Sequence, residues 1–368
     1  MSPNSTKPID RFFLFSVGAL TIVGFVIFLS ASLGLLAQNG ASFGTIALKQ
    51  SISLTIGIVL FFVFSRIKYA RIRKYAFFVF LGSIIVNLLL FIPNLTLYHG
   101  GASRWVDIGF VSFQPSEFLK IAFIIYIAAW ANFAKDRIKS MKFGLLPYLM
   151  VTGILSLLLL AQSDTDTLII IGFTGMVMLV IAGLPWKHAV LAVALFAIGL
   201  GAVIWFRPYA LERVKTYLDH GNDSQGAGYQ INQSLIAIGS GQLAGRGFGQ
   251  SVQKFGYLPE PIGDSIFAVA AEEFGFIGSI VLLALYVSLA ISSFRIGTRA
   301  PDTFGGLLAI GISILIIIES FMNMAAMLGL IPLSGLPLLF VSHGGTALII
   351  VLAASGIVAN VSKYQNSI

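Results

Sequence analysis

Long apolar runs recur along this chain, and their length constrains its fold more than any other feature of the sequence. Each approaches or exceeds the roughly 20 residues that a helix needs to cross the hydrocarbon core of a membrane. We place ten such runs at 13–36, 45–64, 76–92, 117–133, 144–161, 167–184, 188–206, 265–293, 304–328 and 335–361. Only 10% of the residues are charged, against about 25% in an average soluble domain. The sequence therefore predicts an all-α, polytopic integral membrane protein, with residues 1–368 forming a single transmembrane domain.

Basic residues gather in three short loops between these runs. Loop 65–75 carries five Lys or Arg, loop 134–143 carries four, and loop 294–303 carries Arg295 and Arg299. Cytoplasmic loops of membrane proteins are enriched in Lys and Arg. With ten spans, these loops lie on the same side as both termini, so we expect cytoplasmic termini and a cytoplasmic tail at 1–11. The net charge of +8 then reflects this bias, and we expect no nucleic-acid partner.

The polar segments fall on the opposite side of the predicted membrane. They are 93–116, the turn 162–166 and one large extracytoplasmic loop at 207–264. ATP and nucleotide sugars are absent from that side, so a substrate bound there must be energised in another way. The chain has no cysteine, which excludes disulfides and thiolate metal sites. The four histidines show no ligand spacing, and we predict no metal cage.

Asp264 is the strongest candidate for a catalytic residue. It follows the helix-breaking run 258–261 and directly precedes an apolar segment that contains Glu272 and Glu273. One interpretation is a helix N-cap, in which the carboxylate accepts a backbone N–H. The other is a general base, because a carboxylate at the lipid boundary near a second acid has a raised pKa. Glu272 and Glu273 lie about 80° and 180° around the helix from Asp264, so they do not both face one cavity.

Several basic and polar residues are candidates for binding an anionic substrate on the outer side. The glycines at 239, 241, 245, 247 and 249 surround Arg246 and precede Lys254, a pattern that suits either a diphosphate site or a flexible re-entrant loop. Glu117 and Lys120 are three residues apart, so they form a salt bridge on one helix face, unless Lys120 joins Arg104 in holding a lipid headgroup. The remaining candidates are Glu260, Ser342 and His343.

Four motifs resemble the SEDS family (shape, elongation, division and sporulation). They are GASRWVDIG…QPSEFLK, the segment GYQINQSLIAIGSGQLAGRGFGQSVQKFGYLPE, the following GDSIFAVAAEEFG, and GLPLLFVSHGG. The likeness covers nearly the whole chain and is closer to the division branch than to the elongation branch. The resemblance implies a peptidoglycan glycosyltransferase that polymerises lipid II on the outer face of the bacterial cytoplasmic (inner) membrane. It also implies a class B penicillin-binding protein as transpeptidase partner, alongside other divisome or elongasome membrane proteins.

The resemblance further implies that Asp264 is the family's essential acid. It would take the proton of the acceptor 4-hydroxyl in a single inverting displacement, while cationic residues offset the charge of the departing diphosphate. Mg²⁺ and Mn²⁺ are candidate cofactors, although the sequence shows no metal site. The chain departs from the family pattern at three places. Ile262-Gly263 replaces His-Thr, Ser163-Asp164-Thr165-Asp166-Thr167 replaces Pro-Asp-x-Gly-Thr, and His343 replaces Tyr.

Two other functions remain open on the sequence. A lipid II flippase would use Lys120, Asp264 and Glu319 to line a path through the membrane. Transporters often contain internal repeats, and this sequence shows none. A non-catalytic divisome scaffold would tolerate the loss of Asp264.

Overall fold

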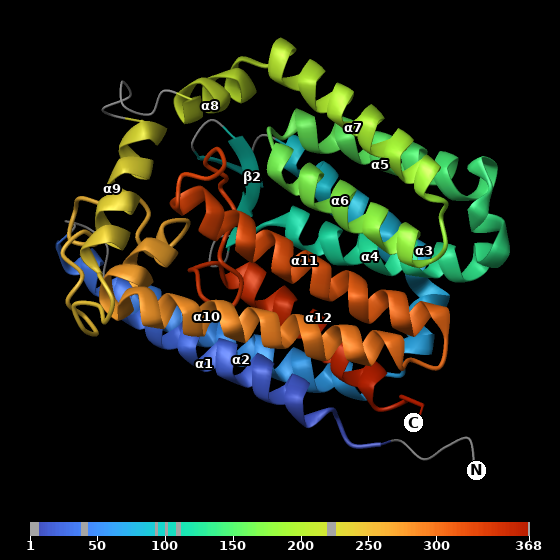
Figure 1. The fold of residues 1–368 in the computed structure, drawn as a ribbon, viewed down its shortest axis with the longest axis horizontal. Helices are drawn as coiled ribbons and strands as arrows, with labels where there is room; N and C mark the ends of the chain where they lie inside the picture. Colours follow the sequence, from blue (N-terminus) through green and yellow to red (C-terminus); the bar gives the residue numbers. More distant parts are fainter. Residues whose placement is uncertain are drawn as a thin grey trace.

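Ten long helices form the body of the protein, accompanied by a small sheet and two shorter helices at one end (Figure 1). The computed structural model describes residues 7–37, 43–92, 95–99, 102–107, 112–218 and 226–366. The long helices are α1 Arg11–Ser32, α2 Phe43–Arg66, α3 Tyr69–Leu88, α4 Pro115–Ala134, α5 Leu146–Ala161, α6 Thr165–Ile181, α7 Trp186–Phe206, α10 Ile266–Thr298, α11 Thr303–Met327 and α12 Gly345–Ser362. The predicted all-α membrane fold is confirmed.

Each predicted span overlaps one of these helices. Nine helices in the described residues are long and apolar enough to cross a membrane, while α6, at 17 residues, is shorter. The last predicted span begins too early, because residues 335–344 form extended chain and turns ahead of α12. Pro332 and Pro337 lack the backbone N–H that a helix requires, and this segment packs instead beneath the turn that carries Asp264.

The centre of the bundle is formed by α11 and α12. In the most apolar 18-residue stretch of each of these helices, 78% of the residues are buried. The corresponding share is 6% for α7, which therefore lies at the edge of the bundle (Figure 1). Close approach of α12 to α2 depends on Gly356, where an added Cβ would lie 2.4 Å from the Phe61 carbonyl oxygen. Small residues allow such backbone contact between membrane helices.

The predicted loop 207–264 is largely structured. It contains α8 Pro208–Leu218 and α9 Ala227–Ser240, followed by an irregular segment that leads to α10. Residues 1–6 of the predicted tail and 219–225 of this loop lie outside the described residues. The antiparallel sheet of β1 Thr96–His99, β2 Ala102–Asp107 and β3 Ser112–Phe113 lies at the same end of the bundle as α8.

The two termini meet the basic turns at the other end of the bundle. The Lys7 N–H donates to the Lys363 carbonyl at 2.9 Å, and the Asn366 N–H donates to Arg299 at 3.0 Å. Lys363 Nζ also donates to the carbonyl of Ser65, at the end of α2. Asp264 precedes α10, whose far end reaches Arg299, so it lies at the end of the bundle opposite the termini.

Candidate active site

Asp264 is presented on a tight turn and does not cap the helix that follows. The N-cap of α10 is Ser265, and its side chain makes no capping hydrogen bond. Among the residues that the structure describes, none donates a hydrogen bond to the half-buried Asp264 carboxylate or forms an ion pair with it. The N-cap interpretation of Asp264 is therefore wrong, and the carboxylate is free to act on a ligand.

The turn itself is held by Glu260 and by Asn323 of α11. The N–H groups of Gly263 and Ser265 both donate to the Glu260 carbonyl at 3.1 Å, closing the turn around a left-handed Glu260 with φ of 47°. Asn323 Nδ2 donates to the carbonyl oxygen of Asp264 at 2.8 Å from within the core. The position of the carboxylate is thus fixed by backbone bonds and leaves its oxygens unused.

Ser342 and His343, both predicted to bind substrate, support this turn from beneath. The Ser342 hydroxyl donates to the Gly263 carbonyl at 2.8 Å, and the His343 N–H donates to the Ile262 carbonyl at 2.7 Å. His343 Nδ1 lies 3.1 Å from Gln50 Oε1. The Ser342 side chain and the His343 backbone thus help to position Asp264, whereas the His343 ring bonds to Gln50 within the protein.

Arg104 of β2 approaches the carboxylate across Gly335. A Cβ at Gly335 would lie 3.4 Å from Arg104 Nη1 and 3.7 Å from Asp264 Oδ2. Any larger residue at position 335 would therefore enter the space between the two charged groups. Of the predicted cationic binding residues, Arg104 is the one that the structure brings beside Asp264.

The surroundings of Asp264 stabilise its protonated form, so that both the acid and the carboxylate are populated near neutral pH. Burial raises the pKa of the Asp264 carboxyl to about 7, and the negative charges of Glu260 and Asp166 add to this effect. The positive charges of Arg104 and Arg213 oppose it. A carboxyl with this pKa is suited to general-base catalysis, which is most efficient when the pKa lies near the working pH.

Lys120 lies in a buried ion cluster and not beside Asp264. Its Nζ is 2.9 Å from Glu117 Oε1 and 2.6 Å from both carboxylate oxygens of Glu319 on α11. All three side chains are buried. The predicted Glu117–Lys120 pair exists, with Glu319 as a further partner that the helix spacing does not reveal. The same burial contradicts the expectation that Lys120 presents a free cation to a headgroup.

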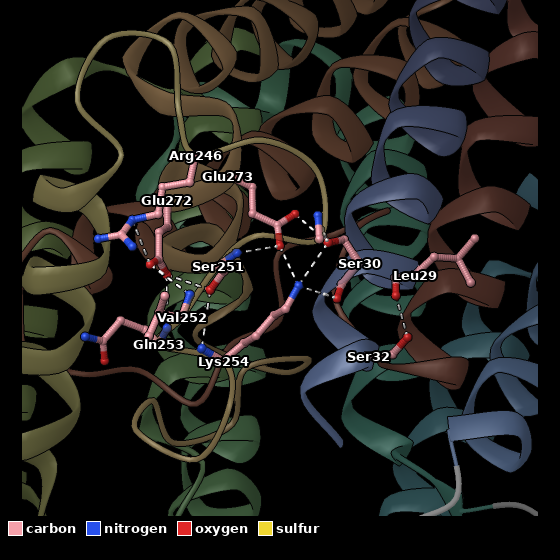
Figure 2. Close-up of polar contacts among 11 residues, drawn as sticks. Leu29, Ser30, Ser32, Arg246, Ser251, Val252, Gln253, Lys254, Glu272 and Glu273 are labelled. Atoms are coloured by element: carbon pink, nitrogen blue, oxygen red, sulfur yellow. Dashed lines mark hydrogen bonds and ion pairs between the residues drawn. The ribbon is translucent and has the colours of Figure 1, made fainter. Parts of the chain in front are cut away.

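A second polar cluster joins the glycine-rich segment to α10 and α1 (Figure 2). Lys254 is fully buried, with Nζ 2.6 Å from Glu273 Oε1 and 3.0 Å from the Ser30 carbonyl. Glu272 accepts hydrogen bonds from the Ser251 hydroxyl at 2.5 Å and from two backbone N–H groups. This corrects the expectation that Lys254 binds a diphosphate, because its ammonium is fully enclosed and paired.

Arg246, the other predicted cation of this segment, pairs with Glu272 from the surface. Its Nε lies 3.4 Å from Glu272 Oε1, and its side chain is 42% exposed. Its backbone N–H also donates to the Glu272 carbonyl, and no contact between described residues joins Arg246 to the Asp264 turn, so the structure does not bring Arg246 into the candidate active site.

The glycines of this segment serve close backbone packing against a break in α10. Gly275 has φ of 65° and interrupts the helix. The N–H groups of Phe276 and Ile277 donate to carbonyls of 242 and 243, while the N–H groups of 246 and 247 donate to carbonyls of 272 and 273. A Cβ at Gly245 would lie 2.1 Å from the Glu273 carbonyl oxygen. These amides are thus bonded to protein and form no anion nest, and the segment is not a flexible loop.

Three site residues were not singled out from the sequence. Arg213 and Tyr209 lie on α8, and Asp166 lies in the first turn of α6. Arg213 Nη1 is 2.8 Å from Asp166 Oδ2, and Arg104 Nη2 is 3.2 Å from Tyr209 Oη. The departure from the family motif at 163–167 was a signal for Asp166, whereas nothing in the local pattern of α8 indicates that it folds back over β2.

The chain matches one family along almost its whole length. A family model described as cell cycle protein, of FtsW, RodA and SpoVE, matches residues 10–367. The probable peptidoglycan glycosyltransferase FtsW of Geobacter sp. (strain M18) is 36% identical over 354 residues, covering 96% of each chain. Stage V sporulation protein E of Bacillus subtilis (strain 168) is 35% identical over 319 residues, covering 87% of each chain.

Solved structures share the fold. A chain from the structure described as "Structural coordination of polymerization and crosslinking by a peptidoglycan synthase complex" is 27% identical, with a TM-score of 0.79 over 97% of this chain and 99% of that chain. The rod shape determining protein RodA of Thermus thermophilus is 26% identical, with a TM-score of 0.70 over 97% of this chain and 98% of that one.

Proposed function

The chain belongs to the cell cycle protein family of FtsW, RodA and SpoVE, and on that premise we propose that it is a peptidoglycan glycosyltransferase that polymerises lipid II into β-1,4-linked glycan strands. Two kinds of relative support this activity. FtsW proteins that are 36% and 38% identical to this chain are named probable peptidoglycan glycosyltransferases, and one structural neighbour belongs to a peptidoglycan synthase complex. By the same reasoning, its partner is a class B penicillin-binding protein that supplies the transpeptidase.

The free carboxylate of Asp264 is the observation that carries the proposed mechanism. As the acceptor 4-hydroxyl attacks C1 of the donor sugar, Asp264 accepts the hydroxyl proton. The bond between C1 and the diphosphate oxygen breaks, and undecaprenyl diphosphate leaves with the electron pair. A single displacement inverts the configuration at C1 and requires no covalent enzyme intermediate. Arg104, beside the carboxylate, stabilises charge on the departing diphosphate.

A divalent cation is compatible with this site. The described residues contain no group of three or more His, Cys, Asp or Glu that could hold a metal. Mg²⁺ commonly takes one or two carboxylates together with substrate phosphates and water, so Asp264 or Glu260 would hold it jointly with the lipid diphosphate. Bound there, it would neutralise part of the negative charge of the leaving group.

Polymerisation of purified lipid II by the purified protein, with and without its partner, tests the function directly. We expect gel electrophoresis to show glycan strands of many disaccharides. These strands should form only when the protein is present. The flippase alternative predicts transfer of lipid II between leaflets without polymer. Lys120 and Glu319, which would line a flippase path, are instead enclosed in one ion cluster. Absence of polymer under conditions in which the partner complex is assembled would refute the proposal.

The raised pKa of Asp264 predicts a pH dependence. Only the carboxylate form accepts a proton, so polymerisation should fall as the pH drops through about 7, the pKa to which burial, Glu260 and Asp166 raise this group. Glu260→Gln removes one of these negative charges and should move the midpoint of the rate profile to lower pH. Glu212→Gln, an exposed change on α8, is the control and should leave the midpoint in place. A midpoint that does not respond to Glu260→Gln would separate the titrating group from Asp264.

The arrangement of the termini predicts the topology in the membrane. The chain ends meet the basic turns at one end of the bundle, so we propose that both termini are cytoplasmic and that Asp264 faces outward. A reporter active only in the cytoplasm should be active when fused after the C-terminus. The same reporter fused after residue 206, at the end of α7, should be inactive. The reverse result would place the site on the cytoplasmic side and contradict the mechanism.

A further inference from the structure

α8 places a second arginine close to the first one. Arg213 of α8 lies with its guanidinium carbon 4.5 Å from the centre of the Tyr209 ring, and Arg104 of β2 donates to the hydroxyl of the same tyrosine at 3.2 Å. Figure 1 shows α8 at the end of the bundle that holds β2. Both arginines act on the charge of Asp264. Two guanidinium groups therefore converge on one phenol beside the proposed base.

Neither guanidinium uses all of its donors. An arginine has five N–H donors in a planar fork. Arg104 Nη2 donates to the Ser163 carbonyl and to Tyr209, while the buried Nε forms an ion pair with Asp164 Oδ1 at 3.9 Å but no hydrogen bond. Arg213 bonds through Nη1 to Asp166, and within the described residues its other nitrogens make no hydrogen bond. Buried polar atoms are nearly always hydrogen-bonded in a complete site, so the long approach of Arg104 Nε to Asp164 points to a missing acceptor.

We infer that Arg104, Arg213 and Tyr209 form a diphosphate-binding site, assembled by α8 and β2 next to Asp264. This inference deepens the proposed function, on which it rests, by naming the residues that bind the diphosphate of the lipid donor. Arginine forks match phosphate oxygens in a bidentate geometry, and the Tyr209 hydroxyl offers a further donor. Of the cations expected on the sequence to bind the anionic substrate, this site keeps Arg104 and does not include Lys120, Arg246 or Lys254.

Asp166 is an internal competitor for this site. Its Oδ2 lies 2.8 Å from Arg213 Nη1, where a phosphate oxygen of the ligand would bind. A diphosphate that binds Arg213 must displace Asp166 or share the guanidinium with it. Removal of the Asp166 charge should therefore strengthen diphosphate binding, whereas a purely structural ion pair predicts no such gain.

The test measures binding to the full chain in lipid nanodiscs, in an Asp264→Asn background so that no turnover occurs. The probes are undecaprenyl diphosphate, undecaprenol, which lacks phosphate, and inorganic pyrophosphate in solution. We expect Arg213→Gln to weaken undecaprenyl diphosphate binding about 10- to 100-fold, as for loss of a hydrogen bond to a charged group, and to leave undecaprenol binding unchanged. Binding of pyrophosphate alone, with the same dependence on Arg213, would show that the site accepts soluble diphosphates too.

Matched variants separate binding from folding. Lys215→Gln removes a positive charge from an exposed position on the same helix and should not change affinity. Arg213→Lys keeps the ion pair with Asp166 but loses the fork, so it should fold and bind with intermediate strength. Asp166→Asn should bind more tightly than the parent. Unchanged affinity in folded Arg213→Lys and Asp166→Asn would overturn the inference.

The two proposals fail in different ways. A chain that binds undecaprenyl diphosphate through Arg213 but does not polymerise lipid II would refute the glycosyltransferase function and keep the site. If the chain polymerises lipid II but Arg213→Gln does not change its affinity for undecaprenyl diphosphate, the site is refuted and the function stands.

Discussion

Asp264→Asn is expected to produce a protein that inserts into the membrane and binds its partner but polymerises lipid II about 10²–10⁴ times more slowly, the usual contribution of a general base. The structure explains why folding should survive. The turn is held through the carbonyl of Asp264 and through Glu260, not through the carboxylate. The measurement is the initial rate of glycan synthesis by purified protein, with thermal unfolding as the control for folding.

Asp264→Glu sharpens this prediction. It retains a carboxylate displaced by about one methylene, so we expect partial activity. A scaffold would show no phenotype in either variant, and a flippase would still deliver lipid II to a separate polymerase. If Asp264→Asn polymerises at the parent rate, the catalytic assignment fails, and Glu260 becomes the nearest acid to test. Glu272 is not a candidate base, since it is fully buried and already bonded within the protein.

Lys254→Met should destabilise the protein by about 3–5 kcal/mol, the typical cost of removing one partner of a buried ion pair. The substitution leaves the buried Glu273 carboxylate without its cation, although Ser30 and the Ser251 N–H still donate to it. Thermal unfolding in detergent, together with the yield of folded protein, measures the effect. The double variant Lys254→Met with Glu273→Gln should recover most of the loss, because no unpaired charge remains.

Arg246→Gln is the matched control in the same segment. Its pair with Glu272 is 42% exposed on the arginine side, and pairs near the surface contribute about 0–1 kcal/mol. We therefore expect little change in thermal unfolding. Equal destabilisation by Lys254→Met and Arg246→Gln would show that burial of the ion pair is not what holds this segment.

The sequence predicts the spans well because their signal is local. A long run of apolar residues indicates a membrane-spanning helix without reference to the rest of the chain, and all ten runs overlap a helix. The errors lie where backbone chemistry overrides hydropathy, as at 335–344, where Pro337 interrupts an apolar stretch. Asp264 could also be found locally, because a helix breaker, an acid and an apolar run occur within a few residues.

The roles of the charged residues could not be predicted in this way. Lys120 and Glu319 are 199 residues apart and Lys254 and Ser30 are 224 apart, so no local pattern distinguishes an enclosed cation from one that faces a ligand. Arg213 shows the opposite case. It lies in an ordinary amphipathic segment, and only the return of α8 across β2 brings it to the site.

At the Gly275 break, the glycine-rich segment and α10 exchange backbone hydrogen bonds, and these bonds alone do not fix the register between the two. Backbone amides and carbonyls are chemically identical along the chain, so a glycine-rich segment shifted by two residues would find the same four bonds to α10. Gly245 opposes such a shift in part, because a side chain in its place would lie 2.1 Å from the Glu273 carbonyl oxygen. The buried Lys254–Glu273 pair opposes it as well, because a shifted segment would enclose Lys254 without a carboxylate. The ion pair thus fixes the register of the segment against α10, because the backbone bonds alone would allow several alignments.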